Sequence, residues 1–197
     1  MPHLASPPTL QSRAIADLRF IRDTMVGAAS YTAFSGWGLI IIGLGALATG
    51  FAAARESNLG VRLGLWLVDA GVSILVGTVS SVLKARTSGQ PLSGAPIRRF
   101  QFSFLPAILA GAVLTFFILP TAAAPLLPGL WLLLYGAALA AAGTQSVRAI
   151  PFMGAGFFAL GTLALAGPPS WSNAILTSGF AGIHVAGGLV ISRRHGG

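Results

Sequence analysis

The strongest constraint in the sequence is residues 126–143, LLPGLWLLLYGAALAAAG, which contain no charged side chain. At a rise of about 1.5 Å per residue, such a helix crosses most of a hydrocarbon core that is roughly 30 Å thick. A helix that is apolar on every face does not suit the surface of a small soluble domain. The segment therefore predicts a transmembrane helix, with lipid as its solvent.

The composition supports a membrane protein. Of the 197 residues, 54% are hydrophobic and only 8% are charged, whereas about a quarter of a globular domain is usually charged. The net charge of +8 comes from basic residues in short segments between apolar runs, where Lys and Arg set membrane orientation. This placement indicates the lipid bilayer as the partner and argues against nucleic acid.

The apolar runs predict an all-α fold, a polytopic membrane protein built as a bundle of six transmembrane helices. An N-terminal amphipathic interfacial helix precedes the bundle. We place the spans near 34–54, 63–83, 101–119, 127–145, 150–167 and 171–192. The remaining segments are a disordered lead at 1–8, the interfacial helix at 9–33 and a basic tail at 193–197.

Basic residues fall unequally on the two sides of these spans. Arg55 and Arg62 lie on one side. The other ten lie on the opposite side: Arg13, Arg19, Arg22, Lys84, Arg86, Arg98, Arg99, Arg148, Arg193 and Arg194. Because cytoplasmic loops carry the excess of Lys and Arg, both termini are expected in the cytoplasm.

Tryptophans lie near the ends of four spans. Membrane proteins concentrate this residue at the level of the lipid headgroups. The sequence therefore predicts interfacial positions for Trp37, Trp66, Trp131 and Trp171.

Glycines recur every seven residues in three spans, at Gly36, Gly43 and Gly50, at Gly129, Gly136 and Gly143, and at Gly154 and Gly161. Such a stripe predicts close, left-handed helix crossings. The shared spacing of the first and fourth spans has two interpretations, common packing chemistry or a three-plus-three inverted repeat as in many transporters.

Asp69 and His184 are the only ionisable side chains within the predicted spans, where such residues are costly and face the bundle interior. Asp69 shares one helix face with Ser73, Ser80 and Lys84. This polar face has two interpretations, a path for protons or a small polar solute and a hydrogen-bonded seam between helices.

His184 shares its face with Thr177 and Gly188 and is expected to point at another helix. We consider three roles: a structural hydrogen bond, a proton relay or solute-binding group, and a haem ligand. The other histidines, His3 and His195, lie in the tails, so one chain lacks a second axial ligand in its spans. Asp69 and His184 are at different predicted depths, and we do not expect them to pair directly.

The predicted lead helix has one apolar face, formed by Ile15, Leu18, Ile21 and Met25. A helix of this kind before a span commonly lies in the membrane interface. Its apolar face either packs on the bundle or docks another protein.

The sequence shows no catalytic constellation. Hydrolysis or group transfer needs a nucleophile with a base and an orienting group, or a metal with several ligands. Four acidic residues and three histidines are too scattered to provide one, and the absence of cysteine removes thiolate chemistry. We therefore expect no enzyme, no metal site and no cofactor.

Several segments resemble a family of small bacterial six-span integral membrane proteins. The similar segments are LRFIR with TM at 18–25, FSGWG at 34–38, LPGLWLLLYG at 127–136, SVR at 146–148, and the final span with His184 and its RRHGG ending. The resemblance covers nearly the whole chain and implies a bacterial inner-membrane protein with six spans. It carries no activity, cofactor or binding residue over to this chain.

The sequence thus favours a non-enzymatic membrane sensor or anchor that acts through a cytoplasmic protein partner or a homo-oligomer. The alternative is a small proton-coupled transporter or channel that uses Asp69 and His184. A haem- or quinone-binding membrane subunit is the third hypothesis.

Overall fold

The computed structural model describes residues 15, 17–19, 35–87, 95–144 and 146–195. The chain divides into two compact units, Met1–Ser30 and Tyr31–Gly197. In the first unit, the described residues 15 and 17–19 are helical, and Ile15 and Leu18 are exposed. The rest of the predicted lead helix, including Ile21 and Met25, lies outside the described residues.

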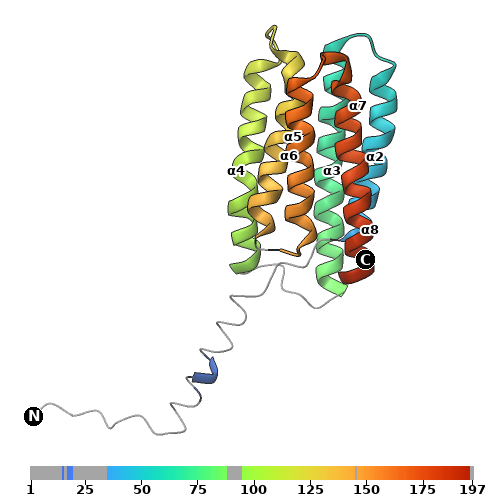
Figure 1. The fold of residues 1–197 in the computed structure, drawn as a ribbon. Coiled ribbons are helices and arrows are strands. Elements are labelled where there is room, and N and C mark those ends of the chain that lie inside the picture. Colours follow the sequence, from blue (N-terminus) through green and yellow to red (C-terminus); the bar gives the residue numbers. More distant parts are fainter. Residues whose placement is uncertain (1–14, 16, 20–34, 88–94, 145, 196–197) are drawn as a thin grey trace, which may run out of the picture. The chain divides into compact units, whose positions relative to one another are not determined.

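The second unit is a bundle of helices (Figure 1). Among its described residues, six helices are long and apolar enough to cross a membrane. The first five are α2 (Gly36–Ala54), α3 (Leu59–Thr87), α4 (Ala95–Ile118), α5 (Leu127–Gly143) and α6 (Ala149–Ala166). The sixth span combines α7 (Ser172–Thr177), a π-helical segment (Ser178–Ile183) and α8 (His184–His195). Short 3-10 helices, Ala124–Leu126 and Pro169–Trp171, precede α5 and α7. The six-span, all-α prediction is confirmed.

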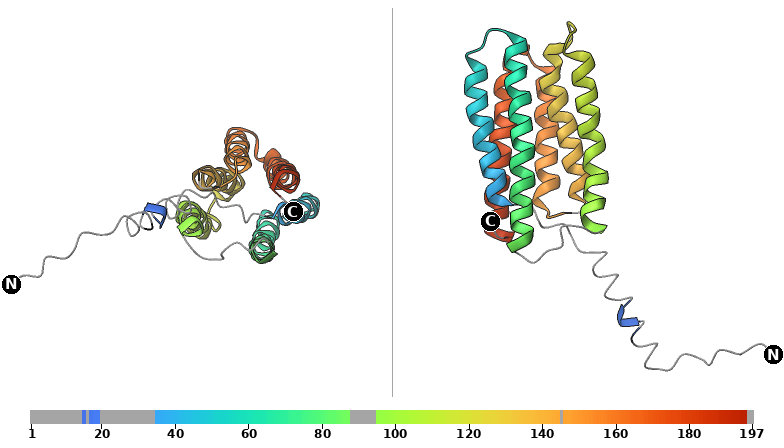
Figure 2. Two further views of the ribbon diagram at one scale, coloured as in Figure 1. Left: turned by 90° about the horizontal axis from the view of Figure 1, so that it is seen from below. Right: turned by 180° about the vertical axis from the view of Figure 1, so that it is seen from behind.

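The helices form a contact series that runs α3, α2, the sixth span, α6, α5 and α4 (Figures 1 and 2). Helices α3 and α4 lie at the two ends of this series and are the most exposed. In the most apolar 18-residue stretch of each helix, only 11% of α3 and 6% of α4 is buried. Their outward side chains are large and apolar, among them Phe102 and Phe116 on α4. Surfaces of this kind suit lipid as the surrounding solvent.

Glycines allow the backbones of α5 and α6 to come into direct contact. A Cβ on Gly136 would lie 2.6 Å from the backbone nitrogen of Phe158, and one on Gly154 would lie 2.6 Å from that of Ala140. The Gly143 position likewise faces Pro151, with the ring nitrogen at 2.7 Å. The glycine stripe of α5 is therefore a helix-packing surface, as the spacing predicts.

The glycine stripe of α2 packs on the sixth span. Gly36 faces the backbone of Gly188 and Ser192, Gly43 faces that of Ala181, and Gly50 meets the side chain of Thr177. The stripe of α2, the first span, thus faces the sixth span, whereas the stripe of α5, the fourth span, faces α6, the fifth span. In a three-plus-three repeat, the partners of the first and fourth spans would be equivalent helices of the two halves. The sixth and fifth spans are not equivalent, so common packing chemistry explains the glycine spacing better.

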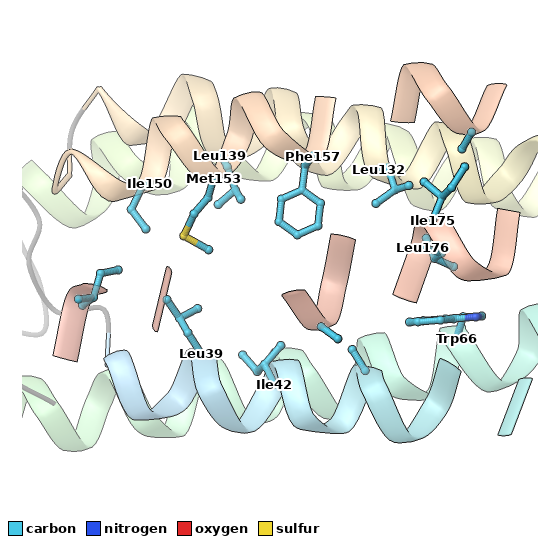
Figure 3. Packing of buried hydrophobic residues seen from close by; sticks show 14 of the residues in the cluster. Leu39, Ile42, Trp66, Leu132, Leu139, Ile150, Met153, Phe157, Ile175 and Leu176 are labelled. Carbon is cyan, nitrogen blue, oxygen red and sulfur yellow. The ribbon is translucent and has the colours of Figure 1, made fainter. Parts of the chain in front are cut away.

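The apolar core lies between the two glycine-packed helix pairs. Leu39 and Ile42 on α2 point toward Met153 and Phe157 on α6 (Figure 3). Phe157 is fully buried, as are Leu132 on α5 and Ile150 on α6. Large aliphatic and aromatic side chains thus fill the interior, which is the packing that holds helices together in lipid.

Two helices are longer than the sequence predicts. Helix α3 extends beyond 63–83 at both ends, and α4 begins at Ala95 instead of near 101. The residues predicted in connections at Arg62, Lys84, Arg86, Arg98 and Arg99 therefore lie within helices. Long basic side chains can reach water or headgroups while the backbone stays helical and hydrogen-bonded. Pro96 also suits the first turn of a helix.

The glycine contacts predict unequal effects of the same substitution. Gly136→Ala should destabilise the bundle by about 1–3 kcal/mol, because its new methyl group would push against the backbone of α6. Gly71→Ala on α3 meets no atom within 4 Å and should be neutral or stabilise by up to about 1 kcal/mol. Reversible unfolding in mixed micelles measures both. Equal stability of the two variants would contradict the backbone contact.

Candidate functional site

Asp69 lies at the contact between α2 and α3. The hydroxyl of Thr49 on α2 donates a hydrogen bond to Asp69 Oδ1 at 3.2 Å. A Cβ at Gly45 would lie 3.4 Å from the same oxygen, so this side of α2 leaves room for the carboxylate. The geometry matches the interpretation of Asp69 as part of a seam between helices.

The other polar residues of α3 follow the same side of the helix. Ser73 is half-buried, and Ser80 donates to the Gly77 carbonyl at 3.2 Å while its side chain meets Gly38 of α2. Lys84 is only 8% exposed and, with Ser80, borders a cavity of about 320 Å³ between α2 and α3. The predicted polar face is therefore directed at α2 for much of its length.

Thr177 is on the sixth span, away from this face. Its hydroxyl donates to the carbonyl of Asn173 at 2.7 Å, and its side chain packs on Gly50 of α2. A threonine that bonds the preceding turn leaves no unsatisfied hydroxyl in the apolar interior. Thr177 thus serves the contact between α2 and the sixth span.

His184 is 1% exposed, and each of its ring nitrogens has a hydrogen-bond partner. Nδ1 lies 2.8 Å from the carbonyl oxygen of Phe180, and Nε2 lies 2.9 Å from the hydroxyl of Tyr135 on α5. Because a carbonyl only accepts, Nδ1 carries the proton and donates it. A neutral ring then accepts at Nε2 from Tyr135. The sequence prediction that His184 faces another helix is confirmed.

The π-helical segment directly precedes His184. It covers Ser178–Ile183, and the imidazole bonds the carbonyl of Phe180 within it. A π-turn departs from the regular i to i+4 bonding of the α-helix and is often found at functional sites. Here the local irregularity and the histidine belong to the same hydrogen-bonded element, and hydrophobic periodicity did not indicate it.

Aromatic rings enclose the pair formed by His184 and Tyr135. The ring of Tyr135 meets Phe157 edge-on at 4.8 Å between centroids and Phe104 at 5.9 Å. The imidazole lies 5.3 Å from the ring of Phe157 and is stacked on Phe180 at 5.8 Å. We call these three phenylalanines with Tyr135 and His184 the aromatic cluster; it joins α4, α5, α6 and the sixth span.

The described chain offers no cluster of three or more His, Cys, Asp or Glu that could hold a metal ion. Haem ligation by His184 would need a free ring nitrogen, yet both nitrogens already have partners in the protein. An iron at Nε2 would have to displace the hydroxyl of Tyr135. The residues present therefore fit a structural pair better than an axial ligand.

Sequence reasoning missed three polar contacts between spans. Trp66 Nε1 donates to Asn173 Oδ1 at 3.0 Å, and Asn173 Nδ2 donates to the carbonyl of Gly50 at 3.1 Å. Trp131 Nε1 donates to the hydroxyl of Thr115 at 2.8 Å. Each contact joins different helices, and no sequence spacing relates these residues.

Two of the four tryptophans that the sequence places near span ends are turned toward other helices, and their depth in the membrane stays a prediction. Trp66 is 5% exposed, and its indole nitrogen, like that of Trp131, donates a hydrogen bond to a side chain on another helix. Trp37 and Trp171 are more than half exposed. An indole near a span end can turn either way, because its apolar ring suits lipid and core alike.

Comparisons with protein-family models, with curated proteins and with solved structures found no match. The resemblance to a family of small bacterial six-span proteins therefore stays a prediction.

The pairing of His184 with Tyr135 predicts a measurable coupling. Tyr135→Phe should destabilise the bundle because Nε2 of the buried imidazole loses its donor. In a double-mutant cycle with His184→Leu, the coupling should be about 0.6 kcal/mol and at most about 1.7 kcal/mol. Unfolding in mixed micelles measures all four proteins. Additive effects of the two substitutions would contradict the bond.

Proposed function

We propose that the protein is a non-enzymatic membrane sensor or anchor of the bacterial cytoplasmic membrane that acts through a protein partner. The observation that carries the proposal is the use of the polar groups within the spans. Asp69 is bonded to Thr49, and His184 is bonded to Tyr135 and to the Phe180 carbonyl. Groups committed to such contacts support a stable scaffold more than a changing transport path.

The basic residues support the proposed orientation. Seven of them lie at or near the bundle end where α2 begins and α8 ends, whereas Arg55 and Arg62 lie near the other. The seven are Lys84, Arg86, Arg98, Arg99, Arg148, Arg193 and Arg194. By the positive-inside rule, this end faces the cytoplasm with both termini. The basic end would then be available to a partner in the cytoplasm.

The transport alternative has less support. Asp69 bonds across the contact between α2 and α3, whereas His184 bonds across the contact between the sixth span and α5. Among the hydrogen bonds of the described residues, none links these two groups. A proton path would need them to be joined by further polar groups or by water.

Reporter fusions test the orientation. A reporter that is active only in the cytoplasm should give signal when fused after Gly197, because that end follows the basic residues of α8. The same reporter inserted between Ala122 and Ala124, in the turn before α5, should be silent. Signal from the second fusion would overturn the proposed orientation.

A paired substitution tests the partner. Leu18→Asp with Ile21→Asp places two charges on the predicted apolar face of the lead helix, so a partner bound there should be released. The control, Ala16→Asp, adds one negative charge on the predicted opposite face and should retain the partner. Quantitative mass spectrometry of proteins purified from the native membrane in mild detergent measures both.

Thermal unfolding of both variants is measured in the same experiment. If the lead helix binds the partner and does not pack on the bundle, the doubly substituted protein should unfold at the same temperature as the wild type. A partner retained by the doubly substituted protein would contradict docking on this face. Unfolding of that protein with a stable Ala16→Asp control would instead assign the face to packing within the protein.

A further inference from the structure

A cavity of about 390 Å³ opens at the end of the bundle opposite the basic end. It lies where the start of α3 meets the starts of α5 and of the sixth span, and its lining includes Arg62, Trp66, Pro128, Ser170, Ser172 and Asn173. This volume is within the range of small-molecule sites, roughly 300–1,000 Å³. Its lining includes no residue of the aromatic cluster and neither Asp69 nor Thr49.

Arg62 supplies a cationic group that the protein itself leaves incompletely bonded. Its Nε is buried and has no hydrogen-bond partner in the structure. Buried polar groups normally have a partner, so the unpartnered Nε shows that contacts within the protein do not fully satisfy this guanidinium. Among the described residues that line the cavity there is no acidic side chain that could neutralise the guanidinium.

The remaining lining is partly rigid and largely apolar. Trp66 and Asn173 are bonded to each other, and Asn173 is also fixed to the backbone of Gly50. Leucine and proline side chains complete the walls, and the hydroxyls of Ser170 and Ser172 are the other polar groups. Apolar walls with a few fixed polar groups are the common form of a ligand pocket.

We propose that this cavity binds a small organic anion, with the guanidinium of Arg62 on its carboxylate or phosphate group. A planar guanidinium matches either group in a bidentate contact. The indole, leucine and proline surfaces would then cover the apolar body of the molecule. This inference goes beyond the proposed function and does not depend on it, because binding is measured on the purified protein alone.

Two sources could supply such an anion, a free organic acid or the headgroup of an anionic lipid. The experiment uses the full chain in phosphatidylcholine nanodiscs. The first arm adds 4-phenylbutyrate, with its uncharged amide as the control. The second arm adds no acid and replaces part of the lipid by phosphatidylglycerol. Thermal unfolding is measured in each case, since a ligand that binds the folded state raises the midpoint.

The matched variants are Arg62→Gln and Arg55→Gln, which remove one positive charge each near the same end. We expect a stabilising shift with the acid or with the anionic lipid, and about tenfold weaker binding in Arg62→Gln. Arg55→Gln should bind as the wild type does, and the amide should not bind. The arm that gives the Arg62-dependent shift identifies the source.

No shift in either arm, or equal shifts in wild type and Arg62→Gln, would overturn the proposal. A second measurement needs no variant, in case Arg62→Gln does not fold. Phenylglyoxal modifies accessible arginines, and peptide mass spectrometry follows Arg62 and Arg55 separately. 4-Phenylbutyrate or phosphatidylglycerol should slow the modification of Arg62 but not that of Arg55. Failure of both to protect Arg62 would likewise overturn the proposal.

Discussion

Backbone contact at glycines is the constraint on which the rest of the bundle depends. Lipid is as apolar as the helices, so the hydrophobic effect that assembles soluble domains gives them little reason to associate. Close van der Waals packing has to supply that attraction. Gly136 and Gly154 bring α5 against α6, and Gly36 and Gly43 bring α2 against the sixth span. These contacts fix how each helix is rotated about its axis, and hence which side chains face inward.

The polar groups of the spans follow from that rotation. Tyr135 directly precedes Gly136, so the glycine contact that positions α5 also directs the phenol toward His184. Asp69 reaches Thr49 beside Gly45 of α2, where the missing side chain leaves room for the carboxylate. In hydrocarbon an unsatisfied polar group costs several kcal/mol, so each such bond makes the helix arrangement more specific. The contacts thus add specificity to an arrangement that packing has already set.

The sequence predicts the number, order and approximate limits of the spans, because apolar runs and basic residues are properties of the chain alone. It also indicates Asp69 and His184, since an ionisable residue in an apolar run needs no structure to be noticed. Their partners, and the inward turn of Trp66, depend on helix rotation and neighbour choice, which no spacing encodes. Both ends of α3 and the start of α4 lie outside the predicted limits, because residues with long basic side chains such as Arg98 continue these helices.

The proposed function requires that Asp69 and His184 join helices by hydrogen bonds and do not conduct ions. Flux of protons, sodium and potassium into sealed vesicles that contain the purified protein tests it most directly. The account predicts the same leak as in protein-free vesicles, for the wild type and for Asp69→Asn alike, because the amide keeps a bond across the helices. Flux in the wild type that Asp69→Asn abolishes would contradict the account and establish the transport alternative.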